Sequence, residues 1–320
     1  MTTPAKKVIH LSHDVDRFRR CLQVGNPVTV KLAYKELVNG LARLSPMDLA
    51  NVTKVALAIK PQHKLDQLEV VNAVLSESER RKWSKFSPTD LAVMTTSIAK
   101  MRFYDLFNPL SERLLYSIPE MRTTDLCVTL WAITRLAKNP TDIHAHIQEG
   151  LKSFLAHNKL RLRQLNNVNI TQLIFVLART RDIFPQLVGV DQVVSFLLTV
   201  LTEKERLHTF ANEAIPFNTY ALVEICEGLE NRPEEELLSA LYAAIKTELD
   251  RRIDLKPEEV IDTFRALGRV GEVDRKMVDE RLIPLLSQAE LTPHRVRGVI
   301  NVLKAVGYAD TDEIFSKLAK

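Results

Sequence analysis

Glycine is scarce in this chain, with only 9 among 320 residues. Folds built from β-hairpins, and doubly wound folds with phosphate-binding loops, need glycine where the backbone turns tightly or approaches a ligand. The scarcity argues against both and favours helices. Cysteine is rarer still, because Cys21, Cys127 and Cys226 are the three in the chain. They lie far apart in apolar helical contexts, so they imply no disulfide framework and fit a reducing compartment.

Long apolar runs are also missing, since no stretch reaches the 18 or so residues of a membrane span. We therefore expect no membrane partner. Hydrophobic residues make up 46% of the chain and charged residues 26%, which is usual for a globular protein and excludes a mostly disordered one.

The net charge of +4 conceals an asymmetry along the chain. Residues 1–170 carry a net charge of +10, whereas residues 171–320 carry −6. A basic half and an acidic half suggest two kinds of partner surface, with nucleic acid a candidate for the first. The alternative is that these charges lie on solvated helix faces of uneven composition.

A short motif recurs along the whole chain. Its clearest copies are Ser45-Pro46-Met47-Asp48-Leu49-Ala50 and Ser87-Pro88-Thr89-Asp90-Leu91-Ala92. Related starts place the Asp-equivalent residue at positions 48, 90, 125, 169, 218, 259 and 295. The mean spacing of about 41 residues is typical of stacked helical hairpins.

The motif has a clear role as a helix start. Ser, or Thr292 in the last copy, accepts hydrogen bonds from the first free N–H groups as an N-cap. Proline fits the first helical position, and an acidic residue at the third position favours the positive end of the helix dipole. Arg295 breaks the acidic rule, so the last cap is expected to be weaker.

Each start predicts a first helix, and a second amphipathic pattern follows each time. The expected first helices are 49–58, 91–99, 126–137, 170–178, 220–229, 260–267 and 296–306. The expected second helices are 65–75, 109–118, 143–157, 193–207, 234–249, 276–286 and 311–318. Residues 12–43 form one more hairpin, with Pro27 near the start of its second helix. The sequence therefore predicts an all-α fold: an α-solenoid of about eight hairpins, like an ARM/HEAT superhelix. It is a single domain over 12–320, after a flexible segment at 1–11.

Two segments carry a family resemblance. SPTDLAVMTTSIAKM (87–101) and TTDLCVTLWAITRLAK (123–138) are similar to units of organellar RNA-associated repeat proteins of the octotricopeptide and FAST-kinase-like type. They also resemble accessory subunits of kinetoplastid mitochondrial RNA-editing complexes. The resemblance covers about residues 12–319, and implies a scaffold of the mitochondrial matrix whose partners are guide RNA or mRNA and other subunits. No RAP-like module follows the repeats, so nuclease activity is not implied.

Motifs of catalysis and metal binding are absent from the sequence. It contains no HExxH, P-loop or glycine-rich dinucleotide pattern and no GxSxG elbow. His144 and His146 are two residues apart, so they point to different sides of a helix and do not form a metal site. Cys226 is expected in the core rather than as a nucleophile. We therefore expect no enzyme activity, no cofactor, no metal and no small-molecule substrate.

Basic clusters between helices are the candidate RNA-binding residues. Inter-helix turns of successive repeats align, so their charges can form a stripe that contacts phosphates. The candidates are Arg80, Arg81, Lys82, Trp83, Lys85, Arg122, Arg135, Lys138, Lys159, Arg161 and Arg163. Trp83 either stacks on a base or fills the groove between adjacent hairpins. The charges themselves are either RNA contacts or solvated loop residues.

An acidic segment, EICEGLENRPEEELLSAL, is the candidate protein-docking region because it would repel RNA and suit a basic partner. Its candidates are Glu224, Glu227, Glu230, Glu234, Glu235 and Glu236. The leading hypothesis is a non-catalytic scaffold of a mitochondrial RNA editing or processing complex, which contacts RNA directly or through a neighbouring subunit. The alternative is a protein–protein adaptor without RNA contact. The basic start of the chain is either the edge of a transit segment or an ordinary first helix.

Overall fold

The computed structural model describes residues 12–24, 26–59, 64–83, 85–106, 108–137, 143–156, 163–183, 190–212, 219, 221–223, 235–289 and 291–308. These residues are helical with short turns and contain no strand, as the sequence predicts. The chain divides into two compact units, residues 1–157 (unit 1) and 158–320 (unit 2). A single continuous repeat domain stays a prediction.

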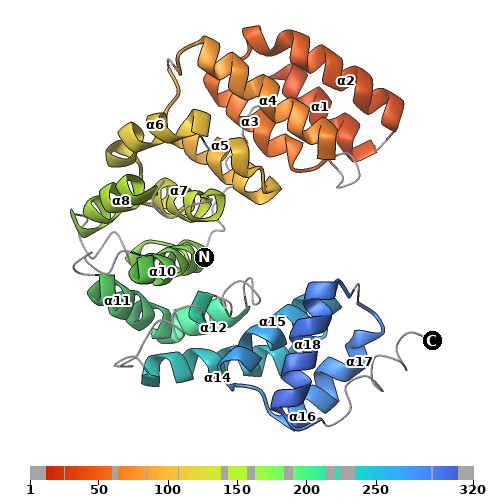
Figure 1. Ribbon diagram of the computed structural model, residues 1–320, viewed down its shortest axis with the longest axis vertical. Coiled ribbons are helices and arrows are strands. Elements are labelled where there is room, and N and C mark those ends of the chain that lie inside the picture. The colour runs from red at the N-terminus through yellow and green to blue at the C-terminus, as the bar shows by residue number, and fades with distance from the viewer. Residues whose placement is uncertain are drawn as a thin grey trace. The chain divides into compact units, whose positions relative to one another are not determined.

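Unit 1 is built from helical hairpins (Figure 1). Helices α1, α3, α5 and α7 pack against one another in succession, and each also packs against the helix that follows it. The helices are α1 (His13–Val24), α2 (Pro27–Gly40), α3 (Pro46–Ala56), α4 (Lys64–Arg80), α5 (Pro88–Met101), α6 (Asn108–Ser117), α7 (Thr123–Leu136) and α8 (His144–Ala156). Short 3₁₀ turns lie at Leu41–Arg43, Tyr104–Leu106 and Ile118–Glu120. The helices expected in this unit are present, and α1, α3, α5 and α7 each pair with the helix that follows.

The predicted caps account for the helix starts. The Ser45 and Ser87 hydroxyls accept the backbone N–H of Asp48 and Asp90, at 3.1 and 3.2 Å. Asp90 also accepts the Ser87 N–H at 2.9 Å, which completes a capping box. Helix α7 differs, because its N-cap is Arg122 and no side chain caps it.

Polar contacts link the starts of neighbouring first helices. The Ser12 N–H donates to Asp48 Oδ1 at 3.1 Å, which ties the start of α1 to that of α3. The Thr89 hydroxyl donates to Asp125 Oδ2 at 2.8 Å, which ties α5 to α7 in the same way. The starts of these helices and the turns that precede them therefore lie along one edge of unit 1, which we call the turn edge.

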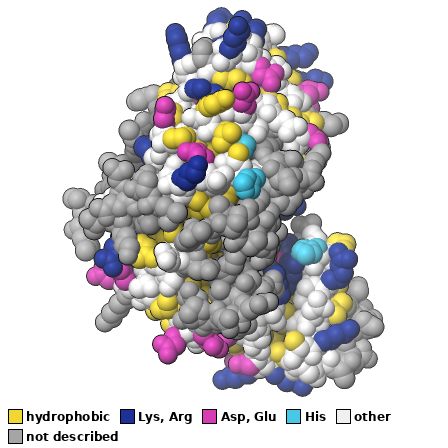
Figure 2. Space-filling view, turned by 60° about the vertical axis from the view of Figure 1, so that its left-hand side comes forward, with side chains coloured by type: hydrophobic (Ala, Val, Ile, Leu, Met, Phe, Trp, Pro, Cys, Tyr) yellow, Lys and Arg dark blue, Asp and Glu magenta, His cyan; other side chains and the backbone are white. Residues whose placement is uncertain are grey.

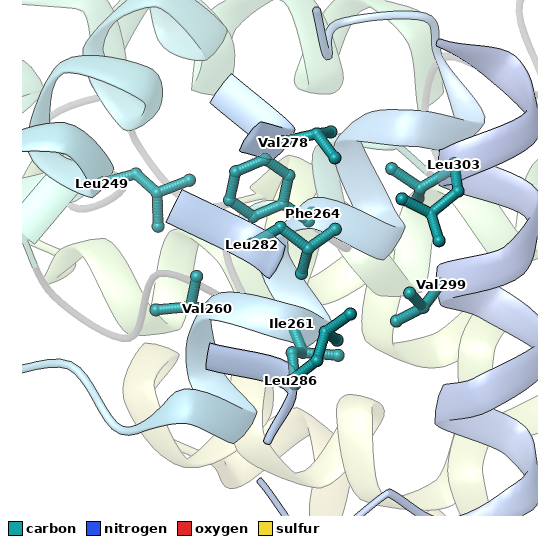
Figure 3. Close-up of a cluster of buried hydrophobic side chains, with 10 residues drawn as sticks. Leu249, Val260, Ile261, Phe264, Val278, Leu282, Leu286, Val299 and Leu303 are labelled. Atoms are coloured by element: carbon teal, nitrogen blue, oxygen red, sulfur yellow. The ribbon is translucent and has the colours of Figure 1, made fainter. Parts of the chain in front are cut away.

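Unit 2 is also helical and has its own core. Its helices are α10 (Asn167–Ile183), α11 (Val190–Thr202), α12 (Lys204–Asn212), α14 (Glu235–Arg251), α15 (Pro257–Arg269), α16 (Arg275–Met277), a π-helical segment (Val278–Leu282), α17 (Ile283–Leu286) and α18 (Pro293–Ala305). Phe264 of α15 lies fully buried among side chains of the π-helical segment and α18 (Figure 3). Such mutual burial of large apolar side chains is the main stabilising term for the unit.

Two predicted second helices are wrong in detail. The expected helix 193–207 is two helices, α11 and α12, divided at Glu203, and α12 makes its own contacts with α10 and α14. The expected helix 276–286 contains Pro284, which lacks an N–H for the α-helical ladder. The residues just before this proline, Val278–Leu282, are π-helical instead of α-helical. The expected helix 311–318 and most of 220–229 lie outside the described residues.

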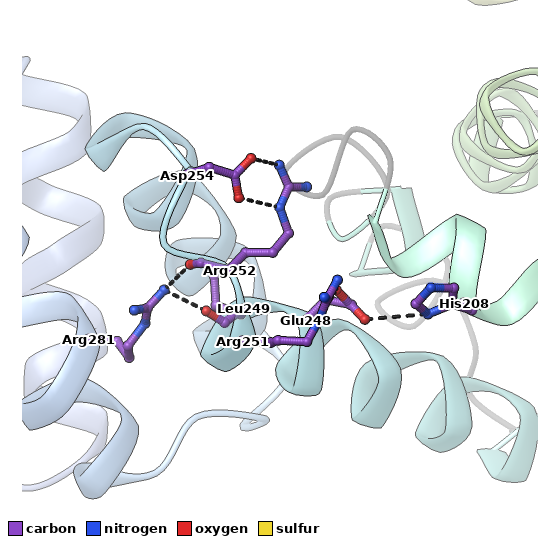
Figure 4. Close-up of polar contacts among 7 residues, drawn as sticks. All are labelled: His208, Glu248, Leu249, Arg251, Arg252, Asp254 and Arg281. Carbon is purple, nitrogen blue, oxygen red and sulfur yellow. Dashed lines mark hydrogen bonds and ion pairs between the residues drawn. The ribbon is translucent and has the colours of Figure 1, made fainter.

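Within the described ranges, an arginine connects successive repeats in three places. Arg81 donates to the carbonyl oxygens of Leu44 and Leu41, at 2.7 and 2.8 Å. Arg206 donates to the Leu165 and Arg163 carbonyls, and Arg281 to those of Leu249 and Arg252 (Figure 4). Each arginine lies 29–43 residues after its acceptors, about one repeat. We call these contacts arginine clasps, because each guanidinium donates to two backbone carbonyls about one repeat earlier.

Candidate nucleic-acid interface

The turn after α4 presents basic residues in a strained backbone conformation. The Lys82 N–H donates to the Glu79 carbonyl at 2.7 Å, and the Trp83 N–H donates to the Ser78 carbonyl at 2.9 Å. This pair of bonds is the Schellman motif, which requires a left-handed residue after the helix. Lys82, Trp83 and Lys85 have φ values of 51°, 54° and 65°. A left-handed conformation costs a residue with a side chain roughly 1–2 kcal/mol.

The same motif recurs at three other helix ends. Gly271 follows α15 and Gly307 follows α18, with φ values of 74° and 87°. Glycine avoids the steric cost at this position. Arg102 follows α5 with φ 60°, so among these described helix ends unit 1 has basic residues where unit 2 has glycine. Strain that is retained in a folded protein points to a function for the residue that carries it.

Trp83 is partly held by its own turn. Its ring lies edge-to-face against Phe86, with centroids 5.4 Å apart and an angle of 63° between the planes. Phe86 is only 4% exposed, whereas Trp83 is partly exposed. The indole thus contacts a buried ring and retains some accessible surface, and its stacking on a base stays a prediction.

Arg80 and Arg81 both contact Glu77, but only one of them is exposed. Arg80 Nε and Nη2 donate to the two oxygens of Glu77 at 2.8 and 2.6 Å. These bonds, with a smaller contribution from Arg81, lower the pKa of Glu77 to about 2. Arg81 is 18% exposed, and its remaining donors form a clasp. The structure therefore reassigns Arg81 from the interface to internal packing.

Three further basic candidates also have internal partners. Arg122 Nε donates to Asp125 at 2.9 Å, and its Nη2 reaches the Thr89 hydroxyl at 3.3 Å. The Arg135 guanidinium lies 5.2 Å from the centre of the Trp131 ring. Arg163 pairs with Glu203 at 3.3 Å. Candidates Lys138, Lys159 and Arg161 lie outside the described residues.

Among the described RNA-binding candidates, Lys82 and Lys85 are exposed to solvent and form no ion pair with a described residue. Sequence reasoning missed Arg43, which is exposed in the 3₁₀ turn before α3. A signal was present, since Arg43 and Lys85 each precede the repeat aspartate, Asp48 or Asp90, by five residues. Arg43, Lys82 and Lys85 are thus exposed cations of the turn edge, which also carries the repeat aspartates Asp48, Asp90 and Asp125.

The acidic candidates are only partly within the described residues. Glu235 and Glu236 are exposed in the first turn of α14, where the helix dipole favours acidic side chains. Glu224, Glu227, Glu230 and Glu234 lie outside the described residues. Figure 2 shows acidic and basic side chains mixed over its upper part, at the level where α1 to α4 lie in Figure 1.

Cys127 and His146 are buried titratable residues of unit 1, and burial shifts the pKa of each toward its neutral form. Burial raises the pKa of the Cys127 thiol, which keeps it protonated and unreactive. His146 Nε2 lies 2.8 Å from the Ser111 carbonyl, and burial lowers the pKa of its imidazole. Among the described residues, no group of three His, Cys, Asp or Glu side chains has a geometry that holds a metal ion.

Comparisons with known proteins add no family to these observations, since no protein-family model matches the chain and no curated protein sequence is significantly similar to it. Within the described parts of the chain, every helix is too short or too polar to cross a membrane.

Proposed function

We propose that the protein is a non-catalytic α-helical repeat scaffold whose turn edge in unit 1 binds RNA. The observation that carries the proposal is the turn after α4, where Lys82 and Lys85 are exposed in left-handed conformations beside a partly exposed Trp83. Lysines contact phosphates, and an indole stacks on a base of any sequence. Such binding is salt-dependent and nearly blind to sequence.

The wider assignment rests on the family resemblance of residues 87–101 and 123–138. It comprises an α-solenoid of about eight hairpins and a place in a mitochondrial RNA editing or processing complex, with guide RNA or mRNA as partner. Exposed Glu235 and Glu236 support protein docking by the acidic half. The consecutive packing of α1, α3, α5 and α7 supports the solenoid, because each hairpin packs against the next.

A salt titration tests the RNA contact. Binding of a fluorescent U20 oligonucleotide is measured by anisotropy for the wild type and for Lys82→Gln/Lys85→Gln. Each phosphate contact to a single strand adds about 0.7 to the slope of log K against log salt. We expect the double variant to lower the slope by about 1.4, and to weaken binding about 25-fold at 0.1 M salt. Lys31→Gln/Lys35→Gln, which removes two exposed lysines from α2, is the matched control.

Two outcomes contradict the proposal. Absence of U20 binding by the wild type at low salt excludes direct RNA contact. An equal loss in the Lys31/Lys35 control shows that affinity follows net charge and not the turn edge.

A single substitution separates function from stability at the turn. Lys82→Gly relieves the left-handed strain, so we expect the free energy of unfolding to rise by about 0.5–1 kcal/mol while RNA affinity falls. Urea unfolding and U20 titration measure the two quantities on one sample. A variant that gains stability and keeps full affinity shows that Lys82 has no role in binding.

A protein–protein adaptor is the second candidate function, and α2 provides the observation that favours it. Val28 and Leu32 lie one helical turn apart and are 69% and 57% exposed. Exposed apolar side chains at this spacing suit an amphipathic partner helix. Purification with and without ribonuclease distinguishes the candidates, because partners held through RNA are lost on treatment and directly bound partners stay.

A further inference from the structure

Helix α18 carries basic side chains and no acidic one. His294, Arg297, Asn301 and Lys304 are all exposed on it, at spacings of three, four and three residues. Residues at these spacings lie on one helix face. With a rise of 1.5 Å per residue, the stripe runs about 15 Å from His294 to Lys304. Neither Arg297 nor Lys304 forms an ion pair with a described residue.

A pair of arginines lies next to His294. Arg295 donates to both oxygens of Asp262 on α15, at 3.2 and 2.9 Å. Arg265 donates to the same carboxylate at 2.8 Å and uses Nη2 to contact His294 Nε2 at 2.7 Å. One carboxylate therefore contacts two guanidinium groups and holds them beside the start of α18.

A glycine makes this arrangement possible. A Cβ atom at Gly298 would come within 2.8 Å of Arg265 Cδ and 2.9 Å of its Cγ. Such contacts are too close for carbon atoms at van der Waals distance. Because Gly298 has no side chain, Arg265 passes alongside α18 and brings its guanidinium to His294. The position of this cation is thus built into the packing of α15 against α18.

From these observations we propose that α18 is a second polyanion surface, which binds the phosphate backbone of RNA through Arg297 and Lys304, with His294 at the start of the same exposed face. The identity of the polyanion rests on the proposed RNA function of the protein. The proposal gives unit 2 an RNA contact of its own, although its half of the sequence is acidic overall. Arginine and lysine side chains are the usual donors to phosphate oxygens.

The chemistry of the face favours phosphate over an acidic protein. Protein interfaces are centred on large apolar or aromatic anchors. The large apolar side chains that stand exposed among the described residues are on other segments, and α18 has none of them. A polar, single-sign surface without such an anchor is the kind that contacts a nucleic-acid backbone.

The test uses the full chain and two probes, fluorescent U20 RNA and a 20-residue poly-glutamate peptide. The α18 variant is Arg297→Gln/Lys304→Gln, and Lys256→Gln/Lys276→Gln removes two exposed lysines from unit 2 as the matched control. We expect the α18 variant to bind U20 about 25-fold more weakly at 0.1 M salt, with a salt slope lower by about 1.4, and the control to bind as the wild type. Circular dichroism melting checks that both variants stay folded.

Each outcome decides a different point. Weaker U20 binding by the α18 variant alone supports the inference. Wild-type affinity in the α18 variant, together with a loss in Lys82→Gln/Lys85→Gln, overturns the inference and keeps the proposed function. Weaker U20 binding by the α18 variant but not by Lys82→Gln/Lys85→Gln supports the inference and overturns the proposal that the turn edge binds RNA. Poly-glutamate binding without U20 binding makes α18 an acidic-protein surface and overturns the inference.

Discussion

The clasp of Arg81 provides a quantitative test of how neighbouring repeats are held together. Arg81→Met keeps most of the side-chain volume and removes the guanidinium. The Leu41 and Leu44 carbonyls then lose donors at 2.8 and 2.7 Å, and Glu77, whose side chain is 11% exposed, keeps only Arg80. Hydrogen bonds that involve a charged group contribute about 1.5–3 kcal/mol each.

Partial solvent access reduces this sum, because Arg81 is 18% exposed and water can reach some of the freed groups. We therefore expect Arg81→Met to lower the free energy of unfolding by about 2–4 kcal/mol. Arg80→Met is the matched control, since Arg80 contacts the same Glu77 but is 64% exposed. Its surface ion pair is expected to contribute about 0.2–1 kcal/mol.

Tryptophan fluorescence during urea unfolding is a suitable assay, because Trp83 and Trp131 are the two tryptophans of the chain and both belong to unit 1. The midpoint and slope of the transition give the free energy for this unit. Arg81→Lys is expected to be intermediate, because an ammonium group does not span two carbonyls and a carboxylate as a guanidinium does. Equal, small effects of Arg81→Met and Arg80→Met would refute the clasp as a stabilising contact.

Three further predictions concern acid stability and packing. The pKa of Glu77 is lowered to about 2, so its ion pairs stabilise unit 1 above about pH 4.5 and this stability is lost as the pH falls toward 2. Glu77→Gln should flatten that part of an acid titration followed by fluorescence, and an unchanged titration contradicts the assignment. Gly150→Ala places a Cβ 2.6 Å from the Leu130 side chain and should cost about 1–3 kcal/mol in urea unfolding, whereas Gly40→Ala, with its nearest atom at 3.5 Å, should not destabilise. Phe264→Ala should cost about 3–5 kcal/mol in unit 2, measured by circular dichroism, and a loss below 1 kcal/mol would show that the cluster is not tightly packed.

The helix starts were predictable because they depend on local chemistry. Serine followed by proline and aspartate satisfies the first N–H groups of a helix within four residues, so Ser45 and Ser87 mark starts in sequence and in structure. Apolar periodicity likewise places one face of each helix in the core. The interruption before Pro284 was missed because apolar spacing alone does not register a lost backbone hydrogen bond.

The candidate site was less predictable, because the identity of a charged residue does not show whether its side chain is exposed to solvent or paired with another group. Lys82 and Arg81 are adjacent in the sequence, yet one projects from a left-handed turn and the other spans to carbonyls about 40 residues away. Arg265 likewise reaches His294 only because α15 packs against α18 at Gly298.

The sequence by itself determined that the chain is helical and where most described helices begin, since caps, prolines and apolar spacing act within one or two turns of a helix. The tertiary structure decided which cations remain for a partner. That decision depends on which carbonyls and carboxylates the packing of distant helices brings within reach of each guanidinium, as it does for Arg81 and Arg295. The distribution of charge along the sequence therefore indicated a class of partner, and the packing of the helices determined which cations stay exposed to bind it.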